Sequence, residues 1–465
     1  MPALAALLLT ACGKELPVQT GRPIYPDYTD VTVPVGIAPL NFCYTEAGPV
    51  KTTFTVGSSS FSVKGRKVRI SPARWQKMLE AAAGGSIHVS SSRDIPDWEI
   101  HVSSDPIEWG ICYRLVAPGY EVHSKMGIYE RELSSYKQHT LIDNTQFLGC
   151  VNCHEFNRGR SDDLTLHIRG DHSATLLRLD GRIDAYNTKT DSTIGFCVYP
   201  YWHPSGDFIA YSVNTTRQGF HEQPDKLIEV YDYASDVLVY DVRSNKLTKF
   251  PDLSRENIWE TFPSFSPDGR TLYFCAASAK KIPEEMETIR YNLCKVAFDP
   301  ATATIGSQID TLVHAEKLGR SVSFPKPSYD GRFIMFTLSD YGNFSIWHHE
   351  ADLWVLDLES MEMRPLDKAN SNDTESYHNW SSNSRWFIFS SRRDDGLFTR
   401  PYICHIDENG KEAKPFMLPQ QDPMEYYSGS FLSFNVPEFI DGPVRFDSKA
   451  AARKINSSDR IQFAQ

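Results

Sequence analysis

The sequence lacks the features that mark several common classes of protein. Its 465 residues hold 59 acidic and 48 basic side chains, a net charge of −11, and no basic run stands out. Nucleic-acid binding is therefore not expected, because phosphate recognition depends on clustered Lys and Arg. Apart from its first residues, the chain has no apolar stretch near the roughly 18 residues that a membrane-crossing helix needs.

Common catalytic signatures are also missing. There is no Gly-x-Ser-x-Gly elbow, no His-Glu-x-x-His pair and no glycine-rich phosphate loop. His348-His349-Glu350 could suggest a metal site, but adjacent side chains diverge on a strand, so we interpret it as a polar loop. The acidic residues are too evenly spread to nominate a general acid and base. These absences favour a role other than catalysis.

The first residues have the pattern of an export signal. Residues 3–9 form a short apolar run, and Leu9-Thr10-Ala11-Cys12 follows. One feature departs from this pattern, because no Lys or Arg precedes the apolar run. The segment Leu9-Thr10-Ala11-Cys12 resembles a bacterial lipoprotein box. The resemblance implies that residues 1–12 are a signal, that Cys12 is acylated, and that lipid is the only membrane attachment. Residues 13–30 would then be a linker, and the expected location is the bacterial envelope, periplasmic or as an outer-membrane lipoprotein.

Nine cysteines fit an exported protein. Besides Cys12 and a Cys-x-x-Cys pair, six are scattered along the chain and could form disulfides in an oxidising compartment. Their pairing is left open: Cys43, Cys112, Cys197, Cys275, Cys294 and Cys404.

Residues 31–116 alternate apolar and polar side chains as strands do, for example over 53–56 and 98–102. One helix interrupts this pattern. Ser71 and Pro72 mark its start and Gly84-Gly85 its end, and its apolar face consists of Trp75, Met78, Leu79 and Ala82. We therefore expect a small, mostly β domain.

Four segments between residues 202 and 389 share one pattern: a strand end, a tight polar turn and an apolar strand. The matching turn positions 204, 267, 329 and 382 are 63, 62 and 53 residues apart. Asp-Gly in such a turn supplies the positive φ that a hairpin needs. The spacing exceeds the roughly 40–50 residues of common propeller blades, so long loops are expected.

Ser266-Pro267-Asp268-Gly269-Arg270 resembles the repeated turn of TolB-family β-propellers. The resemblance covers residues 176–440 and implies a propeller of five or six blades, followed by a tail over 441–465. In the fourth repeat Asn383-Ser384 replaces Asp-Gly. Residues 179–182 and 428–436 are expected to complete one further blade from the two chain ends. The fold class is therefore mainly β.

Cys150-Val151-Asn152-Cys153-His154 has the spacing of a c-type haem attachment motif. The two thiols can form thioethers to one porphyrin, and the His that follows can bind the iron. Composition predicts about 0.005 chance matches. A redox disulfide would require a thioredoxin-like setting, and a zinc site would require a second pair of ligands. A structural role for the motif is the third alternative. We expect one haem c on a connecting segment, residues 117–175.

The sixth iron ligand is left open among four nearby side chains. In order of preference they are His172, His167, Met126 and His123. A His ligand would favour a low reduction potential and a Met ligand a higher one. The candidates for contacts with the haem propionates are Arg158, Arg160 and Arg169.

The whole arrangement resembles exported TolB-like propeller proteins of Bacteroidetes that carry an embedded Cys-x-x-Cys-His, a resemblance that implies no reaction. The leading hypothesis is a mono-haem, cytochrome-like envelope lipoprotein for electron transfer, whose propeller docks a redox partner or another envelope protein. One alternative is a scaffold that binds an envelope protein or glycan and carries a structural haem. The other is a haem peroxidase or sensor with an open sixth position.

Overall fold

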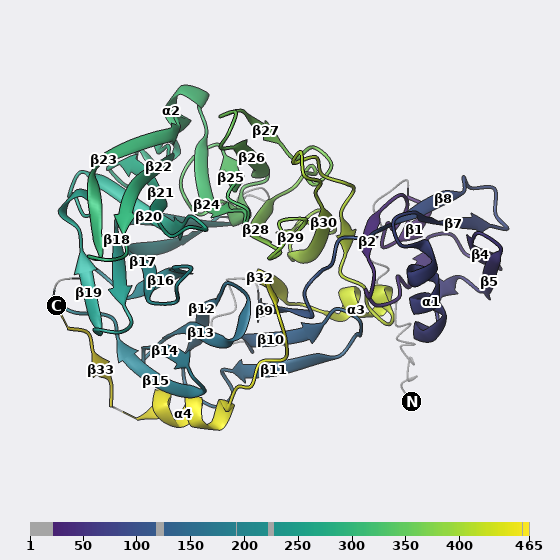
Figure 1. Cartoon of the computed structure of the whole chain (residues 1–465), viewed down its shortest axis with the longest axis horizontal. Helices are drawn as coiled ribbons and strands as arrows, with labels where there is room; N and C mark the ends of the chain where they lie inside the picture. Colours follow the sequence, from purple (N-terminus) through teal and green to yellow (C-terminus); the bar gives the residue numbers. More distant parts are fainter. Residues whose placement is uncertain (1–21, 118–124, 192, 222–226, 458, 465) are drawn as a thin grey trace, which may run out of the picture.

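The computed structural model describes residues 22–117, 125–191, 193–221, 227–457 and 459–464. Strands dominate these residues and form eight sheets, so the expectation of a mainly β protein is confirmed. Six sheets surround a common axis, and the other two, of five and three strands, form a domain beside the ring (Figure 1).

Each of the six sheets forms a propeller blade of four strands in radial order, and β33 (Ile461–Gln462) adds a fifth strand to the sheet of blade 2. From the axis outward they are, in blade 1, β32 (Ser433–Ile440), β9 (Gly110–Val116), β10 (Gly127–Glu132) and β11 (Gln138–Asp143); in blade 2, β12 (Cys150–Asn157), β13 (Arg160–Arg169), β14 (Ala174–Leu179) and β15 (Arg182–Asn187); in blade 3, β16 (Cys197–Trp202), β17 (Phe208–Phe220), β18 (Ile228–Asp241) and β19 (Lys246–Lys249); in blade 4, β20 (Ile258–Phe265), β21 (Thr271–Ser278), β22 (Asn292–Asp299) and β23 (Thr304–Val313); in blade 5, β24 (Ser321–Pro327), β25 (Phe333–Ser339), β26 (Asp352–Asp357) and β27 (Met363–Pro365); and in blade 6, β28 (Glu375–Trp380), β29 (Trp386–Ser391), β30 (Arg400–His405) and β31 (Phe416–Met417).

The innermost strands close the ring. Each contacts the next in the order β12, β16, β20, β24, β28 and β32, and β32 contacts β12 again. Blade 1 therefore combines three strands from the early part of the chain with one from near its end. Apolar side chains fill the space between neighbouring blades, as Phe208 and Val237 of blade 3 do against Phe265 and Leu272 of blade 4. A single blade could not bury both of its faces, which is why the repeats pack radially.

The tight turns between innermost and second strands are where the repeats predicted them. Gly206, Gly269 and Gly331 have φ of 79°, 71° and 77°, and Ser384 has φ of 59° in the fourth repeat. In that repeat the Asn383 side chain accepts from the Ser381 hydroxyl and the Arg385 amide, so it replaces the missing aspartate. The expected turn chemistry is confirmed.

The propeller extends further toward the N-terminus than the repeat pattern indicated. It begins with β9, so residues 117–175 contribute strands to blades 1 and 2 instead of forming a separate segment. Blade 2 turns through Arg158-Gly159, which lacks the Ser-Pro-Asp-Gly signature although both residues have positive φ. Residues 179–182 and β32 belong to two different blades, and the total is six.

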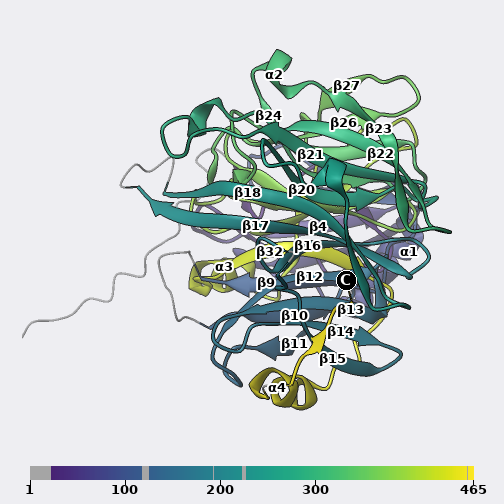
Figure 2. The same cartoon turned by 90° about the vertical axis from the view of Figure 1, so that its left-hand side faces the viewer.

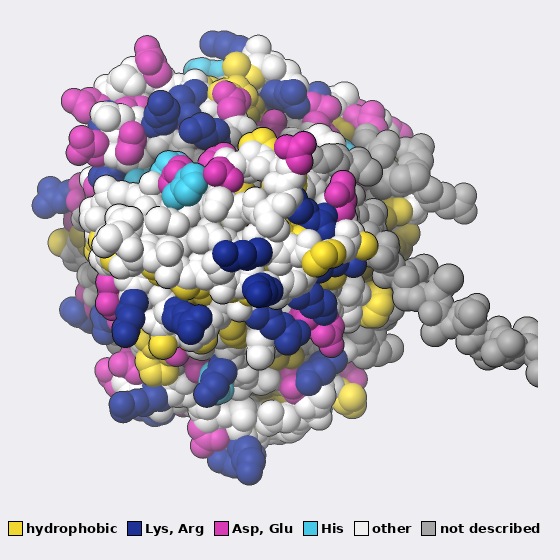
Figure 3. All heavy atoms as spheres, turned by 90° about the vertical axis from the view of Figure 1, so that its right-hand side faces the viewer, with side chains coloured by type: hydrophobic (Ala, Val, Ile, Leu, Met, Phe, Trp, Pro, Cys, Tyr) yellow, Lys and Arg dark blue, Asp and Glu magenta, His cyan; other side chains and the backbone are white. Residues whose placement is uncertain are grey.

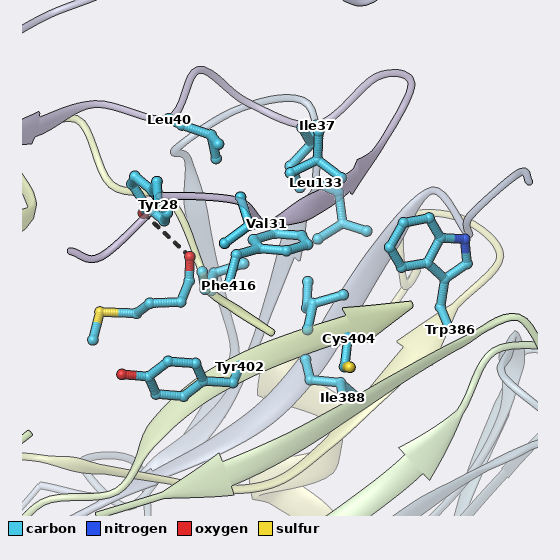
Figure 4. Packing of buried hydrophobic residues seen from close by; sticks show 14 of the residues in the cluster. Tyr28, Val31, Ile37, Leu40, Leu133, Trp386, Ile388, Tyr402, Cys404 and Phe416 are labelled. Carbon is cyan, nitrogen blue, oxygen red and sulfur yellow. Dashed lines mark hydrogen bonds between the residues drawn. The ribbon is translucent and has the colours of Figure 1, made fainter. Parts of the chain in front are cut away.

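The N-terminal domain lies against blade 6. One sheet has the order β2 (Thr32–Pro34), β8 (Trp98–Ser103), β7 (Ser86–Ser91), β4 (Lys51–Val56) and β5 (Ser59–Lys64), and the other has β1 (Ile24–Tyr25), β3 (Phe42–Tyr44) and β6 (Lys67–Val68). Helix α1 (Pro72–Ala82) buries the four apolar residues predicted for its face. Figure 4 shows Val31 and Ile37 of this domain packed near Trp386 and Phe416 of blade 6.

The remaining elements are short helices, single 3-10 turns and one further strand. They are α2 (Ala315–Leu318), α3 (Pro423–Gly429), α4 (Ser448–Asn456), the 3-10 turns Pro251–Leu253, Met286–Thr288 and Ser345–Trp347, and β33 (Ile461–Gln462), which pairs parallel to β15. The β17–β18 hairpin reaches beyond the other strands of its blade (Figure 2). The face around the N-terminal domain mixes both signs of charge with small groups of hydrophobic side chains (Figure 3).

Candidate functional site

The Cys-x-x-Cys-His segment lies on β12, the innermost strand of blade 2. A β-bulge interrupts its pairing with β13, because Val151 faces Ile168 and His154 faces Leu166. Two residues, Asn152 and Cys153, are therefore accommodated where a regular strand would have one. The other five innermost strands have a bulge at the corresponding place.

The bulge aligns the Cys-x-x-Cys-His segment with the innermost strands of the other blades. The position of Cys153 is occupied by proline in four blades and by His378 in blade 6. In the other five blades the position of Asn152 is occupied by residues with φ between 47° and 54°, which is unusual for residues other than glycine, whereas Asn152 itself does not have a positive φ. The five residues are Tyr199, Phe262, Phe324, Tyr377 and Val436. Strained backbone that recurs in this way marks a position held by its surroundings.

A cavity of about 600 Å³ opens around the propeller axis at these bulges. This volume falls within the roughly 300–1,000 Å³ of cofactor and small-molecule sites. Cys150, Cys153 and His154 all contribute to the wall. The two cysteines are partly exposed and are free thiols. The sequence motif is thus placed in the wall of this axial cavity.

Four aromatic rings form an arc along the wall of blades 3 to 6. Neighbouring ring centroids are 4.6 Å apart for Tyr199 and Phe262, 4.4 Å for Phe262 and Phe324, and 5.0 Å for Phe324 and Tyr377. The arc faces the same cavity as the thiols. It offers a planar, apolar ligand the ring contacts that aromatic side chains favour.

The imidazole of His154 is enclosed beside Glu438 of β32. Its Nε2 lies 3.3 Å from Glu438 Oε1, and the two side chains are 0% and 3% exposed. Within the part of the chain that the structure describes, neither ring nitrogen has a hydrogen-bond partner. Burial, together with Arg114 and Lys326, lowers the pKa of His154 to about 3. The imidazole is therefore neutral, the form that binds a metal.

Two guanidinium groups contribute to the cavity without a carboxylate partner among the described residues. Arg114 donates to Asn152 Oδ1 at 2.6 Å, and Arg169 is exposed at the end of β13. Unpaired guanidiniums at a cavity favour a ligand with carboxylate groups, because they can bind each one through two hydrogen bonds. Arg158 and Arg160 do not belong to this cavity: Arg158 lies over the ring of Tyr329, and Arg160 pairs with Asp163.

The candidates for the sixth iron ligand lie at different places relative to the cavity. Met126, buried immediately before β10, the third strand of blade 1, contributes to the cavity wall. His167 points to the other face of β13 from His154, where its Nδ1 meets Thr175 Oγ1 at 3.1 Å, and burial lowers its pKa to about 3. His172 is exposed in the turn after β13. His123 lies outside the described residues, as does Cys12 of the lipoprotein box.

Beyond the bulges, a second set of charged side chains continues along the axis. The ammonium of Lys326 lies 3.1 and 3.3 Å from the carboxylate oxygens of Glu155 and 4.7 Å from the Tyr201 ring centroid. Lys326 contributes both to the main cavity and to a water-sized pocket of about 30 Å³ on the far side. Glu155 is thus engaged with Lys326, whereas Glu438 faces the imidazole.

The residues present fit a covalently attached haem. The observations are two free thiols at the wall of a cavity of suitable volume and a thioether side chain in the same wall. Among the described residues, the buried imidazole has no hydrogen-bond partner and the two guanidiniums have no carboxylate partner. A planar aromatic ring with two carboxylates matches the aromatic arc and Arg114 with Arg169.

Sequence reasoning missed Arg114, Glu438 and the aromatic arc. A usable signal existed in the aromatic-proline pairs Tyr199-Pro200, Phe262-Pro263 and Phe324-Pro325, which precede the predicted turns by a few residues. Aligning Asn152-Cys153 with those pairs would have placed the motif on an innermost strand. Arg114 and Glu438 carry no local signal, because they meet the motif only after blade 1 closes.

Comparisons with known proteins concern the fold alone. No family model and no curated protein sequence matches the chain. Solved structures with a similar fold include TolB from Acinetobacter baumannii, at 10% identity and a TM-score of 0.45 over 80% of this chain and 85% of that one. Kuenenia stuttgartiensis hydrazine synthase is 12% identical with a TM-score of 0.46, over 74% of this chain and 48% of that one.

Two further findings concern the part of the chain that the structure describes. None of its helices combines the length and the apolar character needed to cross a membrane. Nowhere in it do three or more His, Cys, Asp or Glu side chains gather so as to hold a metal ion, and His348-His349-Glu350 is no exception.

Proposed function

We propose that this protein carries one haem c in the axial cavity and transfers electrons outside the cytoplasm. The observation that carries the proposal is the coincidence of the Cys150–His154 motif with the wall of the 600 Å³ cavity. A haem bound there would supply one-electron exchange at its iron. The chain's own residues would attach, orient and shield it.

Each of these residues has a distinct task. Cys150 and Cys153 would bind the porphyrin edge through thioethers, and His154 would bind the iron. Met126 is the best-placed second axial ligand, because it alone among the described candidates contributes to the cavity wall. A thioether ligand favours a higher potential than a second imidazole. Arg114 and Arg169 would bind the propionates, and the aromatic arc would exclude water from one side.

The membrane attachment and the partners of the protein are likewise proposals. A lipid on Cys12 would hold the protein in the bacterial envelope, and the propeller would dock a redox partner or another envelope protein. A scaffold with a structural haem and a haem peroxidase or sensor are the alternatives. Met126 in the cavity wall favours a six-coordinate iron, which argues against the open position that a peroxidase or sensor needs.

The test is covalent haem in matched cysteine variants, expressed together with a haem-attachment system. Wild type is expected to show a haem-stained band after denaturing electrophoresis, and the C150A–C153A double variant none. C197A is the control, because Cys197 holds the place of Cys150 in blade 3 and is likewise a free thiol. An unstained wild-type band overturns the proposal. Slow electron exchange by a stained protein favours the scaffold.

A further inference from the structure

A buried carboxyl group, that of Asp232, lies behind the wall of the axial cavity. Asp232 belongs to β18 and is only 2% exposed. Its Oδ2 accepts from the side-chain amide of Asn214 on β17 at 3.0 Å. Asn214 itself contributes to the wall of the cavity. The carboxyl group is therefore connected through a single side chain to the space in which the haem is proposed to bind.

The side chains that hold Asp232 are uncharged. Asn343, from the segment after β25, donates to the same carboxyl oxygen at 2.9 Å, and the Tyr291 hydroxyl, just before β22, lies 3.5 Å from it. Tyr291 titrates, but burial and then the nearby Asp232 raise its pKa well above the usual value, so it stays neutral. Glu229, three residues earlier on β18, is engaged with His348 at 3.3 Å. None of the groups that contact the Asp232 carboxyl therefore balances a negative charge on it.

This environment leaves the carboxyl group able to exchange a proton near neutral pH. Oδ1 of Asp232 has no hydrogen-bond partner within the described residues, which is costly for an ionised carboxylate. Burial raises the pKa of Asp232 to about 7, although the hydrogen bonds from Asn214 and Asn343 favour the charged form and lower it. A small change in the charge of the cavity is enough to shift such a group from one protonation state to the other.

Tyr199 connects Asp232 electrostatically to the haem motif. It belongs to the aromatic arc and contributes to the cavity wall. Burial raises the pKa of its hydroxyl well above the usual value, and Cys153 and Asp232 are among the groups that raise it further. Charges in a protein interior act on one another more strongly than in water. A charge gained in the cavity should therefore be felt at Asp232.

We infer that Asp232 is the proton-binding site of a proton-coupled electron transfer. When one electron from the redox partner reduces the iron, the Asp232 carboxylate takes up one proton from solvent, and oxidation releases both. The added electron and the added proton balance in charge, and the O–H bond of the carboxyl group is the one bond formed. This rests on the proposed haem in the cavity. Linkage is reciprocal, so protonation of Asp232 favours reduction by the same factor by which reduction favours protonation.

The experiment measures the midpoint potential of the purified holoprotein from pH 5 to 9, beside those of D232N and E260Q. In wild type the equilibrium constant for reduction is expected to fall about fivefold as pH rises across this range. D232N stays neutral, so it should match wild type at pH 5, change little with pH, and exceed wild type about fivefold at pH 9.

E260Q is the matched control. Glu260 is likewise a buried carboxyl group, and burial raises its pKa to about 8. It lies 3.5 Å from Arg255 and is not among the described residues of the cavity wall. E260Q is therefore expected to keep the pH dependence of wild type.

Infrared difference spectra between the reduced and oxidised holoprotein measure the proton itself. On reduction near pH 7, wild type and E260Q should gain the C=O stretching band of a protonated carboxylic acid, and D232N should lack it. This readout separates proton uptake by the Asp232 side chain from a purely structural role, which would leave the band in place.

The inference is overturned if D232N keeps the wild-type pH dependence and infrared band, or if E260Q loses them equally. If D232N yields no folded protein, N343A takes its place. Removing this donor to the carboxylate should move the pH range of the change upward by about one unit, and an unmoved range contradicts the inference. A haem-loaded wild type whose potential does not vary with pH overturns the inference alone, whereas a wild type without haem overturns the proposed function.

Discussion

Cys153 occupies in blade 2 the bulge position that Pro200 occupies in blade 3. The propeller backbone thus places a thiol at the wall of the axial cavity without any change of fold. A thiol at a position usually filled by proline has no packing explanation, because it replaces a rigid ring with a smaller, oxidisable group. This favours attachment of a ligand over a structural role for the motif.

Placing proline at position 153 should separate folding from cofactor attachment. C153P is expected to fold, because proline is compatible with the bulge in four other blades. Its thermal midpoint should lie within a few degrees of wild type, while covalent haem is lost. Calorimetry and haem staining measure the two effects. Retained haem in C153P would contradict attachment through this thiol.

Replacing Met126 should change the coordination of the iron. M126L conserves volume in a buried site, so its cost in stability should stay below about 1.5 kcal/mol. The ferric spectrum is expected to change from low spin to a form that binds added imidazole. H172A is the control and should keep the wild-type spectrum, because His172 is exposed outside the cavity wall. The reverse pattern would make His172 the ligand.

Removing one guanidinium should lower the midpoint potential. A cation beside the cavity disfavours the more positive, oxidised iron, so R169Q is expected to make reduction of the iron harder. Because Arg169 is exposed and solvent screens its charge, the equilibrium constant for reduction should fall by less than tenfold. Potentiometric titration measures this. R160Q should have no effect, since Arg160 already pairs with Asp163 away from the cavity. Equal shifts in both variants would argue against a propionate contact.

Stability should fall in mildly alkaline solution because of His348. Burial lowers the pKa of this imidazole, but Glu229 and Glu350 outweigh burial and raise it to about 9. Its Nε2 lies 3.3 Å from Glu229 and its Nδ1 3.4 Å from Glu350. The stabilisation is complete below the unfolded pKa near 6.5 and is lost as pH rises through 9.

The free energy of unfolding should fall by at most about 3 kcal/mol for a pKa shift of this size. Denaturant unfolding at pH 6, 7.5 and 9.5 measures it, and H348Q should show a flatter dependence on pH over that range. Parallel pH profiles for wild type and H348Q would contradict a charged His348 in the folded protein.

Local patterns were sufficient for much of the fold. The positive φ of Gly206, Gly269 and Gly331 follows from short-range turn chemistry, and the face of α1 follows from helical periodicity. Blades 1 and 2 were not recognised, because the Arg158-Gly159 turn lacks the repeated signature and β32 reaches blade 1 from more than 290 positions along the chain. Such a closing strand depends on long-range pairing.

The residues of the candidate site likewise fall into those that the sequence predicted and those that it could not. Cys150, Cys153 and His154 were found from their spacing alone. The choice among His172, His167 and Met126 was not available from sequence, because proximity along the chain does not give the direction of a side chain. Alternation on β13 turns His167 away from His154, whereas pairing of β9 with β10 places Met126 in the wall of the cavity.

The most direct test of the account is the amount and spectrum of covalent haem in the purified wild-type protein. We predict one haem per chain by pyridine haemochrome assay, resistant to acid-acetone extraction, with a low-spin ferric spectrum. Protein that is folded, made alongside a haem-attachment system and yet shows no Soret absorbance would contradict the account.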